Sequence, residues 1–263
     1  MFRTHGFTIA TRATVTAATM GLLFSPVLGG ASSAKTGGDQ SPQQLAAQAQ
    51  GALRKATSVR LHYQDRSAAA ANSITLPTAM DLALDRQGNC AGSLTLGTHG
   101  GMVQIIKRGA EVWLKPNAAF WTSELPGERG ATAAKTFKNH YIHGSTSDMV
   151  FSGVVNACNL QDLQSAATAS PPATLKEGLA TIVNGTRVVP LSFEVNGLTS
   201  TLYVTTGKPH LLYRASQKGP GTDLTLTFTD YNKPVPAKIP PASASLDVSK
   251  LQSLLGTASP GPA

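Results

Sequence analysis

The sequence is poor in charge and in aromatic side chains. Only 14% of its 263 residues are Asp, Glu, Lys or Arg, and only 6% are aromatic, whereas about 25% of an average soluble protein is charged. A nucleic-acid-binding surface usually shows a dense stripe of Lys and Arg with aromatic residues between them. The sequence contains no such stripe. We therefore expect no nucleic-acid partner, although the formal net charge is +8.

The sequence also lacks the common catalytic and metal-binding motifs. The chain has no GxSxG, CxxC or HExxH motif, so no hydrolase nucleophile or zinc site is marked. His140 and His143, followed by Asp148, could be imagined in a Ser/His/Asp or metal site, but we expect both histidines to be exposed loop residues. The sequence thus predicts a protein that is not an enzyme, needs no cofactor and holds no metal.

No apolar run reaches the roughly 20 residues that a membrane-spanning helix needs. The first twelve residues carry Arg3 and Arg12 and no acid, and residues 13–28 are apolar or small apart from a few hydroxyls. A basic segment followed by a short apolar one is typical of a secretory signal peptide. We assign residues 1–34 to this signal.

The end of the signal resembles the processing site of a bacterial lipoprotein, except that Ala31 stands where the lipidated cysteine would be. We expect cleavage after Ala31 or Ala34 and a secreted or envelope protein without a lipid anchor there. Removing Arg3 and Arg12 leaves 20 basic residues against 14 acids, a net charge near +6. That balance favours an anionic envelope surface as a partner.

Cysteine is scarce as well, with Cys90 and Cys158 alone. In an exported chain, two cysteines most simply form a disulfide. Two buried free thiols or part of a metal site are the alternatives, and a metal site needs three or four ligands. We expect a disulfide with a structural role.

Periodicity is what the sequence does contain. A proline followed by apolar residues at helical spacing predicts a helix over residues 42–58. Alternation with a period of two then predicts strands with one buried face. These strands cover 59–64, 80–85, 93–96, 111–115, 189–195, 200–217 and 222–231. The segment 117–169 loses this alternation and predicts short helices, and 247–256 predicts another.

A large antiparallel sheet with helices inserted in mid-sequence is an α+β fold. A sheet of about ten strands tends to curl, so we expect a half-barrel wrapped around helices, with a cavity where the helices do not fill it. We predict a flexible linker at 35–41, one domain over 42–255 and a disordered tail at 256–263.

Three segments resemble a known family. AEVWLKPNAAFW (110–121), TLYVTTGKPHLLYR (201–214) and LTFTDYNKPVPAKIPP (226–241) are similar to segments of the LppX/LprAFG-type actinobacterial lipoproteins, within the LolA-like group. The most specific piece is the turn that contains Tyr231, Pro234 and Val235 after the strand ending near Phe228. The resemblance implies a half-barrel with a cavity for acyl chains of lipids or lipoglycans, and carriage without catalysis.

The sequence therefore predicts an exported monomer that binds or carries an apolar ligand. An alternative is an envelope interaction or sensory module whose core is filled and binds no ligand. The candidate lining residues are the inward-facing apolar residues of the predicted strands, although most of them could equally be ordinary core. They are Leu82, Leu84, Val103, Ile105, Val112, Leu114, Leu191, Phe193, Leu202, Val204, Leu226 and Phe228. Trp113 and Trp121 are either residues of the cavity mouth or packing residues.

Overall fold

The structure is a computed structural model, and it describes residues 40–256 apart from residues 75, 98–99, 126, 168–169 and 237. The predicted signal peptide, residues 35–39 of the predicted linker and residues 257–263 of the predicted tail lie outside the described residues.

The described chain contains one sheet and a set of short helices. The first half comprises α1 (Pro42–Lys55), β1 (Ser58–Asp65), α2 (Ala68–Ala71), β2 (Pro77–Asp85), β3 (Cys90–Leu96), β4 (Met102–Arg108), β5 (Glu111–Pro116), α3 (Ala118–Glu124), α4 (Glu128–Thr136) and β6 (Tyr141–Ser145). The second half comprises η1 (Met149–Phe151), α5 (Ser152–Ala157), α6 (Leu160–Ala166), β7 (Lys176–Glu177), β8 (Thr181–Val183), β9 (Thr186–Val195), β10 (Leu198–Thr205), β11 (Leu212–Gly219), β12 (Thr222–Thr229), η2 (Ala242–Ala244), β13 (Ser245–Asp247) and α7 (Val248–Gly256).

The sheet has 13 strands in the order β13-β6-β5-β4-β3-β2-β1-β12-β11-β10-β9-β7, with β8 also paired to β9. It is open, because β13 and β7 lie at its two ends. Pairing is antiparallel except between β13 and β6, which run parallel. The predicted α+β fold is confirmed, with the correction that the sheet is mixed.

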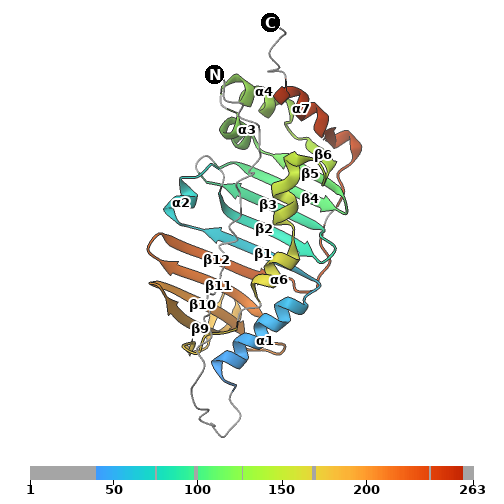
Figure 1. Cartoon of the computed structure of the whole chain (residues 1–263). Coiled ribbons are helices and arrows are strands. Elements are labelled where there is room, and N and C mark those ends of the chain that lie inside the picture. The colour runs from blue at the N-terminus through green and yellow to red at the C-terminus, as the bar shows by residue number, and fades with distance from the viewer. Residues whose placement is uncertain are drawn as a thin grey trace.

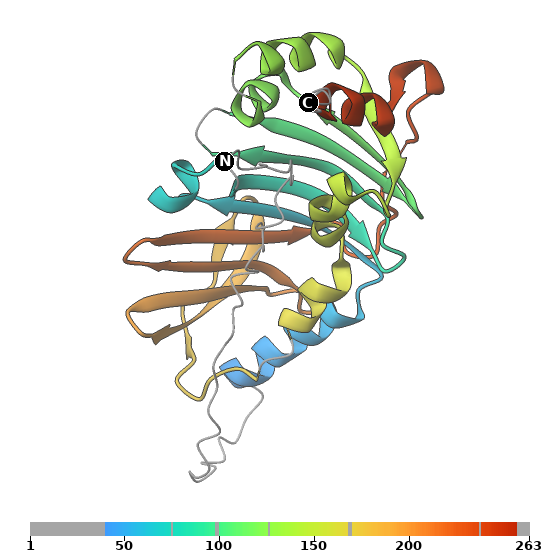
Figure 2. The ribbon, with the colours of Figure 1, turned by 45° about the horizontal axis from the view of Figure 1, so that its top comes forward.

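The helices lie on one face of this curved sheet (Figures 1 and 2). α3, α4 and α7 lie over the end that carries β4–β6, and α1 and α6 lie toward β9–β12 (Figure 1). One continuous core joins the helices to the sheet. It includes Leu45 and Leu53 of α1, Trp121 of α3 and Phe137 just after α4, packed with inward-facing strand residues such as Ile105.

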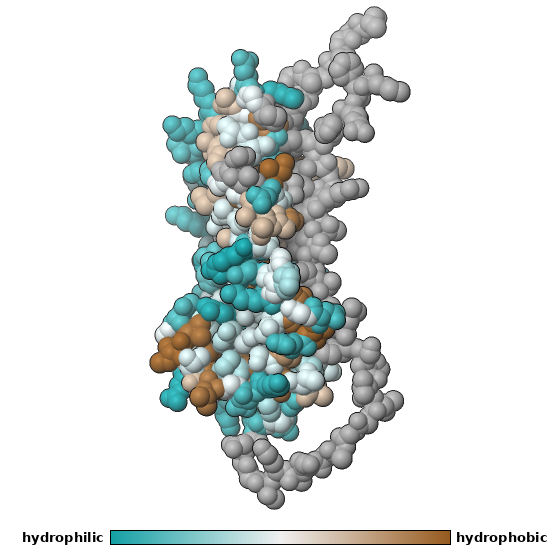
Figure 3. All heavy atoms as spheres, turned by 90° about the vertical axis from the view of Figure 1, so that its left-hand side faces the viewer, coloured by the Kyte–Doolittle hydropathy of each residue, from teal (hydrophilic) through white to brown (hydrophobic). Residues whose placement is uncertain are grey.

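The opposite face of the sheet is mainly polar. On β1, Arg60 and His62 alternate with the core residues Val59 and Leu61. The apolar packing identified on this face is a small cluster of Ala83, Ala91 and Val235 with Ile106 beside it. Figure 3 views the molecule from the side and shows a narrow profile in which hydrophilic residues predominate and hydrophobic ones gather in separate places.

Helix α1 is fixed at both ends. Ser41 and Gln44 form a capping box, in which the Gln44 N–H donates to Ser41 Oγ (3.2 Å) and the Ser41 N–H donates to Gln44 Oε1 (3.0 Å). At the other end, Gln164 Nε2 donates to the carbonyls of Leu53 (3.0 Å) and Ala56 (2.8 Å). These bonds occupy groups that a helix terminus leaves unpaired, so α6 helps to hold α1 in place.

The predicted disulfide joins Cys90, the first residue of β3, to Cys158, the C-cap of α5, with the two Cα atoms 5.4 Å apart. Both cysteines are buried in the main core. The bond therefore links the helical layer directly to the sheet.

The segment 117–169 is not entirely helical, contrary to the prediction. It contains β6, in which only Ile142 is buried and which pairs with β5 and β13. His143 consequently lies on a strand rather than in an exposed loop, and its ring stacks on Trp113 with centroids 4.8 Å apart. His140 does lie in a loop, where its Nδ1 is 2.9 Å from the carbonyl oxygen of Lys138.

Candidate ligand pocket

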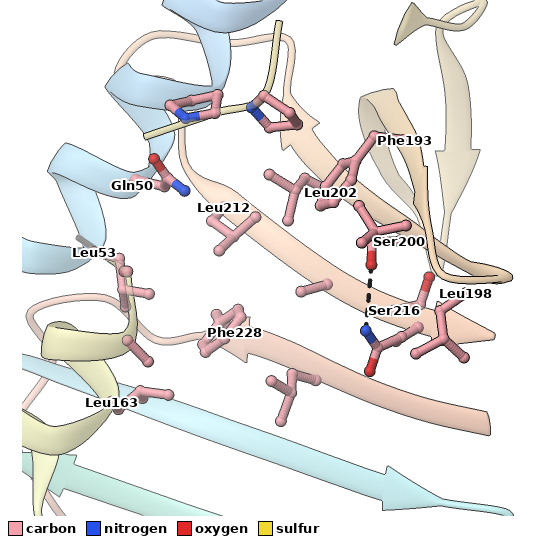
Figure 4. Close-up of a pocket in the computed structure, with 18 of the residues that line it drawn as sticks. Gln50, Leu53, Leu163, Phe193, Leu198, Ser200, Leu202, Leu212, Ser216 and Phe228 are labelled. Atoms are coloured by element: carbon pink, nitrogen blue, oxygen red, sulfur yellow. Dashed lines mark hydrogen bonds between the residues drawn. The ribbon is translucent and has the colours of Figure 1, made fainter. Parts of the chain in front are cut away.

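A pocket lies between the concave face of β9–β12 and the helices α1 and α6 (Figure 4). Its volume is about 280 Å³, close to the lower end of the roughly 300–1,000 Å³ that is typical of small-molecule pockets. It lies at the end of the sheet that α3, α4 and α7 do not cover (Figure 1). Fewer helices over this part of the sheet leave space between the layers.

The sheet forms the floor of the pocket, because alternate residues of neighbouring strands point to the same side. Leu202 of β10 is paired with Leu191 of β9, and Leu226 of β12 is paired with Ala215 of β11. The floor residues are Phe193, Val195, Asn196, Leu198, Ser200, Leu202, Leu212, Ala215, Ser216, Gln217, Leu226 and Phe228.

The helical side forms the opposite wall. Gln50 and Leu53 come from α1, and Leu163 and Ala166 come from α6. Ala167, Pro171 and Pro172 continue the wall after α6. Figure 4 shows Leu53 and Leu163 on the helical side, across from Phe228 on the sheet.

The structure divides the twelve predicted lining residues into two groups. Four of them line the pocket: Phe193, Leu202, Leu226 and Phe228. The other eight are buried in the main core: Leu82, Leu84, Val103, Ile105, Val112, Leu114, Leu191 and Val204. Most of the second group belongs to β2, β4 and β5, at the end of the sheet where the helices are denser.

The pocket is uncharged, because none of the described lining residues is Asp, Glu, Lys, Arg or His. Its polar groups are the side chains of Gln50, Asn196, Ser200, Ser216 and Gln217. Two of them are paired with each other, because Gln217 Nε2 donates to Ser200 Oγ across 3.5 Å (Figure 4).

Tyr231 fixes one edge of the floor. Its hydroxyl donates to the carbonyl oxygen of Leu212, the first residue of β11, across 2.6 Å. Burial raises the pKa of Tyr231 above its ordinary value, so the phenol stays protonated and keeps donating at neutral pH. Tyr231 belongs to the sequence motif that suggested the family resemblance, and this bond gives it a structural role.

Sequence reasoning missed the helical wall. Gln50 is a polar residue among buried apolar positions of α1, with only 8% of its surface exposed. The pattern of α1 signalled that this position is buried, because it follows Ala46 and Ala49 on the same helical face. Leu163 and Leu212 gave no such signal, since being apolar does not distinguish a pocket from a core.

Trp113 and Trp121 are packing residues. Trp113 is nearly buried on β5 against the His143 ring, and His143 also contacts Glu111. Trp121 is buried on α3 and stacks on Phe137 with centroids 5.2 Å apart. Neither belongs to the lining of the described pocket.

The polar face of the sheet carries a group of titratable side chains that superficially matches a catalytic triad. His62 Nε2 is 3.5 Å from Thr229 Oγ1, and His62 Nδ1 is 3.5 Å from Asp81 Oδ1. Both distances exceed the roughly 2.6–3.2 Å of a nucleophile–base pair. Asp81 instead forms a closer ion pair with Arg60, with Oδ1 2.7 Å from Nε and Oδ2 2.8 Å from Nη2. This geometry is that of a surface ion pair with a neighbouring histidine.

Two further observations concern the described part of the chain alone. Its His, Cys, Asp and Glu side chains nowhere gather in threes in a way that would hold a metal ion. None of its helices combines the length and hydropathy needed to cross a bilayer.

Comparison with known proteins gives matches in structure but not in sequence. No family model matches the chain, and no curated protein sequence does. LprF from Mycobacterium bovis superposes with a TM-score of 0.50 and 14% identity, over 76% of this chain and 96% of LprF. The Mycobacterium tuberculosis lipoprotein LppX superposes with a TM-score of 0.47 and 14% identity, over 75% of this chain and 98% of LppX. The LprF superposition confirms the sequence resemblance at the level of the fold: the chain has an LprF-type α+β fold.

Proposed function

We propose that the chain is an exported, non-enzymatic protein that binds or carries an apolar ligand, the acyl chain of a lipid or lipoglycan, in the pocket between β9–β12 and the helices α1 and α6. The observation that carries this proposal is the pocket itself, an uncharged and mainly apolar space between two packed layers. The LolA-like fold agrees with it, since the family resemblance implies carriage of acyl chains.

The hydrophobic effect supplies the driving force. Each methylene group transferred from water contributes about 0.8 kcal/mol, so a chain that buries eight of them gains about 6 kcal/mol before the entropy of ordering is subtracted. A ligand would also cover Leu202 and Leu226, whose partly exposed surfaces face the pocket.

The proposal extends to the place of action. The predicted signal peptide supports a location of the mature chain outside the cytoplasmic membrane, and Ala31 in place of a cysteine supports the absence of an acyl anchor there. The net charge near +6 favours an anionic envelope surface as a contact. We propose that it acts there as a monomer.

Native mass spectrometry of the protein isolated from its own host tests this function. We expect a discrete added mass that organic extraction removes and that is identified as lipid. Leu226→Trp places a larger side chain in the pocket, so it should abolish most of the added mass. A bare polypeptide mass under gentle conditions would contradict the proposal and favour the interaction module with a filled core.

The matched control is Leu179→Trp, the same change at a site that is 92% exposed and outside the pocket. This variant should keep the ligand. If both variants lose it equally, the loss comes from the added tryptophan and not from blocking the pocket.

A further inference from the structure

The pocket contains one buried polar side chain that lacks a partner. Gln50 projects from α1 toward the sheet (Figure 4) and is 8% exposed. Its amide makes no hydrogen bond to any other residue in the part of the chain that the structure describes. The Gln50 amide atoms are not among the fully buried unpaired polar atoms of the described chain, so they face the open pocket, where a ligand group can hydrogen-bond to them in place of water.

The neighbouring buried glutamine behaves differently. Gln164 is also nearly buried, but its amide donates to two carbonyls at the end of α1. Ser200 and Gln217 are paired across the floor. Gln50 is therefore the pocket group whose environment points most directly to a ligand.

The charge and size of the pocket restrict that ligand. A buried carboxylate or phosphate needs a cationic partner to offset its desolvation, and none of the described lining residues supplies one. A volume of about 280 Å³, near the lower end of the range that is typical of small-molecule pockets, favours one alkyl chain over several.

We infer that the pocket selects a single-chain, uncharged amphiphile whose hydroxyl, ester or amide group hydrogen-bonds to the Gln50 side chain while its alkyl chain lies over Leu202, Leu212 and Phe228. A glutamine amide offers both a donor and an acceptor, so it serves each of these groups. The inference rests on the proposed function and adds to it the class of ligand and the residue that recognises it.

Isothermal titration calorimetry with 1-monolauroylglycerol, below its micelle concentration, tests the inference. Gln50→Leu should weaken binding about five- to tenfold, as expected for the loss of a neutral hydrogen bond. The same variant should bind dodecane, which has no polar group, as tightly as the wild type does or more tightly. Laurate, the anionic counterpart, should bind the wild type at least tenfold more weakly than the monoacylglycerol.

Gln48→Leu is the matched control, because Gln48 is exposed on the same helix two residues away. It should leave all three affinities unchanged. Urea unfolding of both variants checks that a change in binding does not reflect a change in folding.

The outcomes separate this inference from the proposed function. Equal affinity of wild type and Gln50→Leu for the monoacylglycerol, or laurate binding as tightly as the ester, would overturn the inference and leave a lipid carrier of another specificity. If none of the three probes binds the wild type and the isolated protein also carries no lipid, both proposals fail.

Discussion

At the scale of single residues, Gln164 connects the two helices that form one side of the pocket. Its amide group lies at the C-terminal end of α1, where it donates to the carbonyls of Leu53 and Ala56. Arg86 adds to the same end, donating from Nε to Ala56 (3.0 Å) and from Nη2 to the carbonyl of Arg54 (2.8 Å). Leu53 and Leu163 stand next to this junction and line the pocket, so its integrity affects the pocket wall.

We expect Gln164→Leu to lower the free energy of unfolding by about 1–2 kcal/mol, because two buried hydrogen bonds are lost. The cost should stay in this range, since the Ala56 carbonyl keeps the bond from Arg86 and the Leu53 carbonyl keeps one from the Ala56 N–H. Urea denaturation followed by circular dichroism measures it. Gln161→Leu, an exposed position on the same helix, should change stability little, and equal stabilities of the two variants would contradict a capping role.

The sequence predicted which residues face inward from the sheet, but it did not separate the residues that line the pocket from those of the core. All twelve apolar residues that were predicted to point inward do so, and four of them reach the pocket. Alternation shows which side chains share a face. It carries no information on whether a helix packs over them, so core and pocket residues have the same sequence signal.

At the scale of elements, the Cys90–Cys158 disulfide joins the start of β3 to the end of α5 across 68 residues. Helix α6 follows immediately and carries Leu163 to the pocket. The bond therefore restrains the segment that positions part of the pocket wall.

Replacing both cysteines by alanine should lower the free energy of unfolding by about 2–4 kcal/mol, because the unfolded chain regains the entropy that the closed loop removes. Urea unfolding of the oxidised wild type and of the variant gives the difference. Reduced wild type serves as the internal control and should unfold near the midpoint of the variant. Identical midpoints for oxidised and reduced wild type would show that the bond contributes nothing to stability.

The elements that sequence reasoning missed are those that depend on distant partners. The strand β6 has only one buried residue, and β13 has three residues in all. β6 pairs with β5 from the same half of the chain, but β13 comes from about 100 positions later and pairs with β6 in parallel. Short strands of this kind lack a periodic signal of their own, because a distant neighbour supplies their hydrogen bonds.

At the scale of the whole molecule, the arrangement of helices divides the sheet into a filled end and an end with a pocket. α3 packs near β4 and α7 near β6, whereas α1 packs near β10 and β11. The proposed carrier function belongs to the second end. The proposed place of action depends on the predicted signal peptide and its cleavage.

We predict that the exported product begins near Ser32 or Lys35 and carries no acyl group, because the position of a lipidated cysteine is occupied by Ala31. N-terminal sequencing and intact mass measurement of the protein from its native host check this. Growth with labelled fatty acid provides the control, and a known lipoprotein of the same cells should incorporate the label. A product that starts at Met1, or one that is labelled, would contradict the prediction.

The sequence by itself determined the α+β class, the helix at the start of the domain, the inward faces of the strands and the pairing of the two cysteines. These follow from local periodicity, from helix capping and from the oxidising compartment that a signal peptide implies. Only the tertiary structure decided that the sheet is open and mixed, that His143 lies on a strand, and that Gln50 faces a pocket. The physical reason is that a cavity is space left between packed layers, and its existence depends on where the helices lie rather than on the composition of the strands beneath them.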